Sequence, residues 1–322
     1  MASIEKMAEW FAASQNLVLM GHVFPDGDAS GSVMALKLAA EAMGKRAAAY
    51  LPGGLAKLYA FLPRAGEFVG SPKEMDFLPE SAMAVDVADI ARLGDGEGMF
   101  RAAKDTAVLD HHGTNPGFGR VNCVDAQRAA TGELALALIK KLGVFITPEM
   151  ASWLYTAICT DCGQFGYANT TGNTMRAAAE CVDAGAEPEY LTKMLYRTRT
   201  EARTRLLGLV LGGLSVECEG KIASAVLTED MLARAGASRE ENEGIVNYLV
   251  EISGVKIGIL AEQRGRGAKL SLRSAKGYDV ARDVAVPLGG GGHANAAGVS
   301  MDVPVEEALK IALEKARAAV RT

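Results

Sequence analysis

Acidic and histidine residues follow three short apolar runs in the first half of the chain. The tripeptide Asp110-His111-His112 comes directly after one run, His22 after another, and Asp86 ends a third. The chain has four histidines, and all of them lie in segments rich in glycine or aspartate. Carboxylates and imidazoles are side chains with which proteins hold divalent metal ions. These residues are therefore the first candidates for chemistry.

The expected secondary structure places these residues at one edge of a sheet. The apolar runs are typical of buried strands, and they alternate with helix-like segments, which predicts a parallel sheet covered by helices. In such a sheet, ligands bind beyond the carboxyl ends of the strands. Loops from separate strands then meet in one crevice. Carboxylates crowded together there need a cation, because like charges repel strongly in a low dielectric.

The spacing His-x3-Asp-x-Asp suits a pair of metal ions. A tight turn through a proline and a glycine aims two aspartates at neighbouring positions, so His22 with Asp26 is expected to hold one ion and Asp28 the other. Asp86 is expected to bridge both ions. The ligand set favours Mn²⁺ and admits Mg²⁺ or Co²⁺. Two ions roughly 3.5–4 Å apart activate a shared hydroxide and stabilise an in-line phosphoryl transition state, with His112 near the leaving group.

Each of these motifs has a plainer reading when it stands alone. Asp26-Gly27-Asp28 is typical of a turn, Asp161 is compatible with a carboxylate at a helix end, and a lone DHH tripeptide is a weak signal. Their joint occurrence beside apolar segments favours a metal centre. Cys159 and Cys162 form a single CxxC, whereas a zinc knuckle needs a second pair, so core cysteines are expected here.

A glycine run marks the second half of the chain. The segment 289–298 reads GGGGHANAAG; consecutive glycines expose backbone N–H groups, and a helix beginning after them would favour an anion. His293 adds a donor, and a flexible turn is the alternative. Arg273 lies in a strand-like segment, on the face opposite Leu272. Its guanidinium suits a terminal phosphate, while an isolated surface arginine remains open.

The expected elements give an α/β protein with two domains. Strands are predicted over 17–20, 47–51, 82–87, 107–109, 214–217, 222–227, 255–262 and 269–273. Helices are predicted near the N-terminus and over 32–43, 131–142, 149–158, 174–184, 242–252 and 305–320. One more helix is expected to run from Pro188 to Leu211. The domains would be 1–186 with the parallel sheet, a helical linker 187–213, and a smaller mixed domain 214–322.

Composition limits the function further. The 322 residues carry a net charge of −5 and no dense basic tract, which argues against binding long duplex nucleic acid. A small phosphorylated substrate needs only a local positive site. A signal-peptide pattern and a bilayer-spanning apolar run are both lacking. The five cysteines are scattered and odd in number, as in a reduced cytoplasmic protein.

Six motifs together resemble the DHH phosphoesterase superfamily. They read GHVFPDGDASGS, AVDVAD, LDHHGTN, TDCGQFGYANTT, SLRS and GGGGHANAAG, and the resemblance covers nearly the whole chain. It is similar to stand-alone proteins with a DHH domain and a DHH-associated C-terminal domain, and among these to nano-RNases of the NrnA type. The resemblance implies an enzyme that hydrolyses very short 5′-phosphorylated RNAs, including pGpG, to mononucleotides, and 3′-phosphoadenosine 5′-phosphate (pAp) to AMP.

The same resemblance implies roles for individual residues. One Mn²⁺ would be held by His22, Asp26 and Asp86, and the other by Asp28, Asp86, His111 and Asp161. Asp110 would orient a ligand histidine, and His112 would contact the scissile phosphate or the leaving group. Substrate recognition would fall to the second domain, at Arg273, Ser274, Gly291, Gly292 and His293. Cys162 departs from the family pattern, since many relatives carry threonine there.

Other functions fit the sequence less well. A RecJ-like single-strand exonuclease is disfavoured because no further nucleic-acid-binding domain is visible, and a membrane-bound cyclic-dinucleotide phosphodiesterase because no membrane segment is visible. The glycine–histidine motif argues against an inorganic pyrophosphatase of the same superfamily. A catalytically silent nucleotide sensor is disfavoured by the complete ligand set. Strand polarity, base preference and oligomeric state, including a homodimer, stay open.

Overall fold

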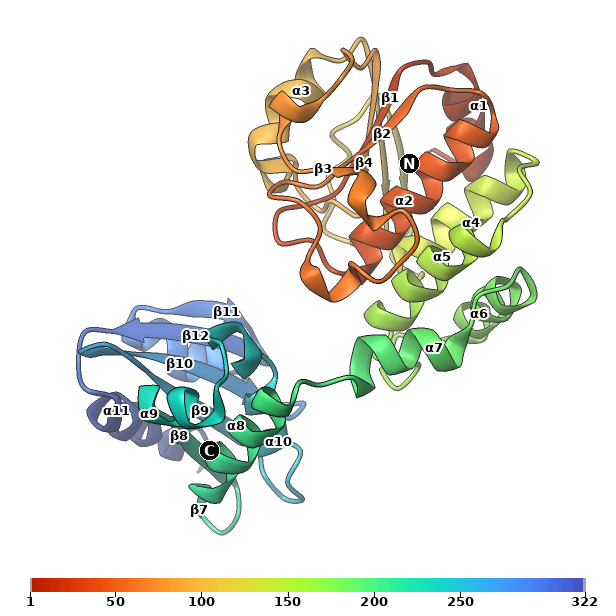
Figure 1. Ribbon diagram of the computed structural model, residues 1–322. Helices are drawn as coiled ribbons and strands as arrows, with labels where there is room; N and C mark the ends of the chain where they lie inside the picture. The colour runs from red at the N-terminus through yellow and green to blue at the C-terminus, as the bar shows by residue number, and fades with distance from the viewer. Residues whose placement is uncertain (1, 321–322) are drawn as a thin grey trace. The chain divides into compact units, whose positions relative to one another are not determined.

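The computed structural model describes residues 2–320, which form two compact units. The units are Met1–Thr198 and Arg199–Thr322, and each consists of a six-stranded sheet with helices packed on it (Figure 1). Within the described residues, no helix is both long and apolar enough to cross a membrane. The α/β class with a parallel sheet and a second, mixed sheet is confirmed.

All strands of the first sheet are parallel, in the order β3-β2-β1-β4-β5-β6. Their bounds are β1 (Leu17–Met20), β2 (Ala47–Tyr50), β3 (Phe68–Val69), β4 (Ser81–Val85), β5 (Asp105–Asp110) and β6 (Val121–Val124). The four predicted strands are β1, β2, β4 and β5. The two missed strands lie at the edges, where β3 has only two residues and Asn122 interrupts the apolar run of β6.

Helices cover both faces of this sheet. One face carries α1 (Ile4–Ala13), α2 (Gly27–Ala42), α4 (Thr131–Lys141) and α5 (Pro148–Asp161), with α6 (Gly172–Asp183) packed on α5. The other face carries α3 (Glu97–Ala102). Helix α2 lies between the sheet and α5, and Gly31 permits that approach, because a Cβ there would lie 2.3 Å from the Trp153 carbonyl oxygen. Burial all round explains why α2 has little amphipathic pattern.

The predicted single helix from Pro188 to Leu211 is wrong. The structure has α7 (Pro188–Thr192) with a π-helical turn to Arg197, then a break, then α8 (Glu201–Gly212). The break arises because the Thr200 hydroxyl caps α8 by accepting a hydrogen bond from the Arg203 N–H at 2.9 Å. Leu206 and Val210 of α8 are buried in the core of the second unit.

The second sheet is mixed, in the order β11-β12-β10-β9-β8-β7, with only β8 and β9 parallel. Its strands are β7 (Ser215–Glu217), β8 (Ile222–Leu227), β9 (Ile257–Arg264), β10 (Gly267–Ser274), β11 (Gly291–His293) and β12 (Ala296–Met301). Helix α11 (Val305–Ala319) covers one face, while α8, α9 (Glu229–Ala235) and α10 (Ile245–Val250) cover the other.

The glycine run forms strands instead of the start of a helix. Strand β11 pairs with β12 in an antiparallel hairpin, and β12 pairs with β10. At Gly292 the backbone has a φ of 144°, and a Cβ would lie 2.4 Å from the Ala296 carbonyl oxygen. Only glycine fits this close turn of the hairpin. Strand β12 lies between β11 and the Arg273 strand β10, and the helix expected after the glycines is not present.

Candidate metal and catalytic centre

Three adjacent strands of the first sheet bring the acidic motifs together. Strands β1, β4 and β5 are neighbours, His22 lies two residues beyond β1, Asp86 follows β4 directly, and Asp110 is the last residue of β5. Because all strands run parallel, these carboxyl ends share one edge of the sheet. The residues that the sequence placed at strand ends therefore lie at one edge of the sheet.

His22 faces two carboxylates. Its Nε2 atom lies 3.7 Å from Asp26 Oδ2 and 3.6 Å from Asp86 Oδ2, while its Nδ1 lies 2.8 Å from the Val23 carbonyl oxygen. In the neutral tautomer with the proton on Nδ1, that proton would donate to the carbonyl and Nε2 would keep its lone pair for an ion. Asp26 is half-exposed, whereas His22 and Asp86 are buried. These three residues form one potential ligand cluster.

His111 faces a second group of carboxylates. Its Nε2 lies 3.8 Å from Asp28 Oδ2, 3.6 Å from Asp86 Oδ1 and 3.5 Å from Asp161 Oδ2. Its Nδ1 lies 3.2 Å from the Arg128 carbonyl oxygen, which fixes the ring. Asp161, the last residue of α5, thus reaches the same centre as the strand-end residues. Asp86 is shared by both groups, as a bridging ligand would be.

The N-terminus of α4 holds Asp28 in place. Asp28 accepts hydrogen bonds from the N–H groups of Thr131 at 2.6 Å and Gly132 at 2.8 Å, and from the Ser32 hydroxyl at 3.1 Å. The residue at the cap position of α4, Ala130, has no side chain that could satisfy these donors. Asp28 therefore caps α4 from a distant part of the chain.

Asp86 is constrained through both its side chain and its backbone. The Thr131 hydroxyl donates to Asp86 Oδ1 at 2.9 Å, and the Asp86 N–H donates to the Leu109 carbonyl oxygen at 2.9 Å. The φ of Asp86 is 61°, in the left-handed region that few non-glycine residues adopt. Such conformations persist where the surroundings enforce them, and they concentrate at functional sites.

Asp110 orients His112 and not the ring of His111. Asp110 Oδ1 lies 2.7 Å from His112 Nδ1 and also accepts from the His111 backbone N–H at 2.8 Å. Asp110 Oδ2 accepts from Asn115 Nδ2 at 2.6 Å, and the same amide donates to the Val87 carbonyl. The ring of His111 lies instead beside the Arg128 carbonyl oxygen. The His112 side chain is 38 % exposed, and its Nε2 is not involved in the bond to Asp110.

Burial and mutual repulsion shift the titration of this centre. Burial raises the pKa of Asp28 well above its usual value, with further contributions from Asp86 and Asp161. Burial likewise raises the pKa of Asp86 and brings that of Asp161 to about 6. For His22, burial opposes protonation, but the carboxylates of Asp26 and Asp86 that face its Nε2 raise its pKa to about 10. The protein alone therefore leaves these carboxylates short of positive charge.

The donor set fits divalent cations. Ligands that surround one ion octahedrally at about 2.1 Å lie about 3–4 Å from one another, which matches the 3.5–3.8 Å separations between the imidazole Nε2 atoms and the carboxylates. Most of these separations are too long for hydrogen bonds. Carboxylates and imidazoles without thiolates suit Mn²⁺ or Mg²⁺ better than a structural zinc. The sequence missed Thr131, Gly132 and Asn115, for which the only signal was their place at a helix start or beside the DHH tripeptide.

The residues predicted to recognise substrate lie in the second unit. Arg273 of β10 and His293 of β11 both pair with Ala296 of β12, so they share one level of the sheet. The Ser274 hydroxyl donates to the Tyr278 carbonyl oxygen at 2.7 Å and accepts from Asn295 Nδ2 at 3.0 Å, which braces the loop before the hairpin. Gly291 and Gly292 belong to the same hairpin.

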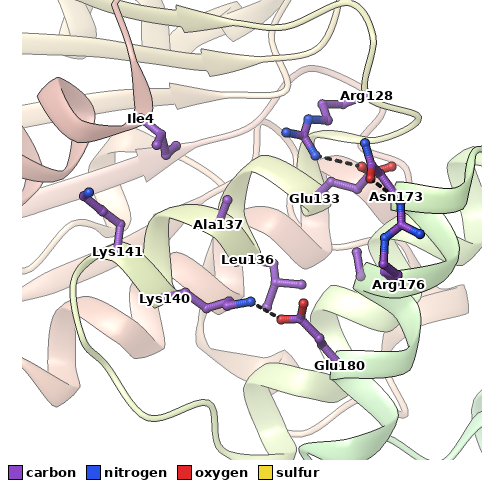
Figure 2. A pocket seen from close by; sticks show the side chains of 11 residues that line it. Ile4, Arg128, Glu133, Leu136, Ala137, Lys140, Lys141, Asn173, Arg176 and Glu180 are labelled. Carbon is purple, nitrogen blue, oxygen red and sulfur yellow. Dashed lines mark hydrogen bonds and ion pairs between the residues drawn. The ribbon is translucent and has the colours of Figure 1, made fainter.

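A separate pocket of about 520 Å³ contains none of the predicted site residues. It lies between α4 and α6, and Figure 2 shows Lys140 paired with Glu180, and Arg128 beside Glu133. Apolar residues such as Leu136 form part of its lining. Glu133 and Glu180 offset two of the four cationic side chains in its lining.

Two family models match most of the chain. The DHH family N-terminal domain matches residues 16–158, and the DHHA1 domain matches residues 219–322. The bifunctional oligoribonuclease and PAP phosphatase NrnA of Thermus thermophilus is 36% identical over 301 residues, which is 92% of this chain and 87% of that protein.

Solved structures share the fold. An exopolyphosphatase-related protein from Bacteroides fragilis superposes with a TM-score of 0.89 at 26% identity, covering 99% of this chain and 97% of that one. The exonuclease RecJ bound to manganese has a TM-score of 0.53 at 15% identity, covering 100% of this chain and 94% of that one. With the strand-end cluster and both domains matched, the chain belongs to the DHH family and carries a C-terminal DHHA1 domain.

Proposed function

We propose that this protein is a Mn²⁺-dependent phosphoesterase that hydrolyses very short 5′-phosphorylated oligoribonucleotides to mononucleotides and pAp to AMP. The single observation that carries the proposal is the shared carboxylate of Asp86, which faces both His22 and His111 at 3.6 Å. The relative from Thermus thermophilus, named an oligoribonuclease and PAP phosphatase, supports the substrate class. Linear dinucleotides such as pGpG belong to the same class of substrate.

The ligands assigned to the two ions follow the two clusters. His22, Asp26 and Asp86 would hold one ion, and Asp28, Asp86, His111 and Asp161 the other. A bound pair of divalent ions supplies an activated water at neutral pH and offsets the charge of a phosphoryl group in the transition state. The protein excludes solvent from this chemistry, because Asp28 and Asp86 are buried.

We assign His112 the role of acting on the leaving group. The hydrogen bond that His112 Nδ1 donates to Asp110 raises the pKa of His112, against the opposing effect of burial, and so favours the protonated imidazole. Asp110 stays ionised for this role, since hydrogen bonds from His112 and Asn115 hold its pKa below its usual value despite burial. His112 would then donate a proton to the departing ribose oxygen.

Arg273, Gly291, Gly292 and His293 would anchor the phosphate end of the substrate. The guanidinium suits a phosphate, and the glycines leave the sheet surface open beside it, since a Cβ at Gly291 would meet nothing within 4 Å. If the end of the substrate is bound in this way, the efficiency of cleavage should depend on the length of the RNA. Beyond roughly five nucleotides we expect cleavage efficiency to fall, because the terminal phosphate of a longer strand is no longer bound at Arg273.

One assay series tests the proposal. The purified protein with Mn²⁺ is given pAp, 5′-phosphorylated RNAs of two to about twenty nucleotides and a cyclic dinucleotide, and products are separated by chromatography. We expect AMP from pAp and mononucleotides from the shortest RNAs. A flat profile out to the longest RNA would favour a RecJ-like exonuclease, a preference for the cyclic substrate would favour a cyclic-dinucleotide phosphodiesterase, and binding without turnover would favour a nucleotide sensor.

A further inference from the structure

Strand β10 presents a row of polar side chains on one face of the second sheet. Lys269, Ser271 and Arg273 alternate with apolar residues that are buried against α11. Because successive residues of a strand point to opposite faces, the polar row looks away from α11. These three side chains line a pocket of about 420 Å³ whose other wall is formed by residues 239–246.

The strand register continues this row beside the glycine hairpin. Ser271 pairs with Gly298 of β12, and Gly298 pairs with Gly291 of β11. Directly paired residues share one face of the sheet, so two of the three positions at this level carry no side chain. The polar row thus lies beside backbone that no side chain covers, at Gly298 and Gly291. This position is two residues along the strands from Arg273 and His293.

Only part of the positive charge in this pocket is available to a ligand. Arg239 and Arg264 both pair with Glu262 at 2.9 Å. Lys269 has no carboxylate within 4 Å in the described part of the chain, and it is exposed. Arg273 donates from Nη1 to the Leu272 carbonyl oxygen, which leaves its other donors free of protein contacts that the structure records. Lys269 and Arg273 are therefore the two cations of the row.

The spacing of these cations suits an extended anion. Four residues along a strand separate the Lys269 and Arg273 Cα atoms by about 13 Å, so side chains that stand perpendicular to the sheet reach different phosphates. We propose that the Lys269–Ser271–Arg273 row is a track for the sugar–phosphate backbone, in which Lys269 binds a second phosphate of an oligonucleotide whose terminal phosphate is held at Arg273. This proposal rests on the proposed function and assigns it a subsite.

A lysine variant with a matched control tests the track. Lys269→Ala is compared with Lys310→Ala, which removes an exposed lysine from α11 on the opposite face of the sheet. For a 5′-phosphorylated trinucleotide we expect Lys269→Ala to raise KM about three- to tenfold with kcat nearly unchanged, and a smaller rise for pAp. The slope of log affinity against log salt should fall by about 0.7, the value for one phosphate contact of a single strand. Lys269→Arg should restore KM.

The outcomes separate the two hypotheses. If Lys269→Ala matches Lys310→Ala on every substrate, or raises KM for pAp as much as for the trinucleotide, the track is wrong while the proposed function stands. If the unaltered protein cleaves neither substrate, the proposed function fails instead. Glu243 on the facing wall gives a test of opposite sign: Glu243→Gln should lower KM for the trinucleotide, because it removes a charge that repels phosphate.

A second inference concerns Phe24, which lies between the ligand candidates His22 and Asp26. Its side chain is 92% exposed, and its backbone has a φ of 54°, a conformation costly for an aromatic residue. The backbone therefore holds an apolar ring in solvent beside the metal centre. Aromatic side chains in single-strand sites stack on bases with little regard to sequence. We infer that Phe24 stacks on the base of the nucleotide at the metal centre.

A matched pair of variants tests the stacking role. Phe24→Ala is compared with Leu78→Ala, which removes another side chain that is 90% exposed in the same unit. We expect Phe24→Ala to raise KM for pAp and for a dinucleotide about tenfold, with Mn²⁺ affinity unchanged by calorimetry, and Phe24→Trp to retain the original KM. A Phe24→Ala protein with the kinetics of Leu78→Ala would overturn the inference, and loss of Mn²⁺ affinity would reassign Phe24 to support of the metal loop.

Discussion

The Thr131 hydroxyl donates a hydrogen bond to the Asp86 carboxylate at 2.9 Å. The same residue donates its backbone N–H to Asp28 at 2.6 Å. One threonine at the start of α4 therefore fixes two carboxylates assigned to metal ions, each through a different group. Partners of this kind orient ligands without touching the metal.

We expect Thr131→Val to weaken Mn²⁺ binding about 10- to 100-fold, the range seen when such supporting hydrogen bonds are removed. The change keeps the size of the side chain and the backbone bond to Asp28, so the apoprotein should still fold. Calorimetric titration of the apoprotein with Mn²⁺ measures the effect, and Thr131→Ser should recover affinity. Unaltered Mn²⁺ affinity in Thr131→Val would show that Asp86 is held by other contacts.

Chelation should abolish hydrolysis, and Mn²⁺ should restore it better than Zn²⁺, because the donors are carboxylates and imidazoles without thiolates. Asp86→Asn should prevent this recovery and reduce the bound metal from two equivalents, since the altered residue is the shared one. Excess Mn²⁺ should raise the Tm of the unaltered protein and of Asp302→Asn, a control exposed in the second unit. Full Mn²⁺-dependent activity in Asp86→Asn would end the shared-ligand hypothesis.

His112→Ala should lower kcat about 10²- to 10⁴-fold, as expected when an acid–base group is lost. Metal content should stay at the level of the unaltered protein, because the His112 Nδ1 is hydrogen-bonded to Asp110. Elemental analysis beside steady-state kinetics separates the two effects. Loss of one metal equivalent would instead make His112 a ligand, a role compatible with its 3.6 Å distance from Asp86.

Metal uptake should release protons at pH 7. In the metal-free protein the pKa of His22 is raised to about 10, so its imidazole is protonated below that pH and must become neutral to bind an ion through Nε2. Apparent Mn²⁺ affinity should therefore increase as pH rises from 6 towards 8. Calorimetry in two buffers of different ionisation enthalpy measures the release, and equal heats in both buffers would contradict it.

The site residues that lie at strand ends were the easiest to predict from the sequence. Buried strands of a parallel sheet are continuous apolar runs, so the residues after β1, β4 and β5 could be read directly from the sequence. The start of α2 could not, because Gly27 and Asp28 are poor helix formers. Helix α2 begins there because the Asp26 carboxylate accepts from the Asp28 and Ala29 N–H groups.

Two further features depend on partners far away in the sequence. The glycine segment exposes N–H groups whether a helix or a strand follows, and pairing of β12 with β10 decides for a strand. The orientation of the His111 ring depends on the Arg128 carbonyl oxygen, which lies 3.2 Å from His111 Nδ1. Both contacts join residues that are far apart in the sequence, so neither could be predicted from the spacing of residues in a motif.

The left-handed backbone of Asp86 restricts which amino acids can occupy this position. Aspartate, asparagine and glycine adopt a positive φ at modest cost, whereas β-branched and bulky residues do so rarely. Among all substitutions at position 86, the stability of each variant should therefore depend first on how readily the new residue adopts a positive φ. Asparagine and glycine would keep the backbone conformation but lack the negative charge. Glutamate would keep the charge but adopts this backbone conformation less readily. Aspartate alone satisfies both demands, one of the backbone and one of the carboxylate.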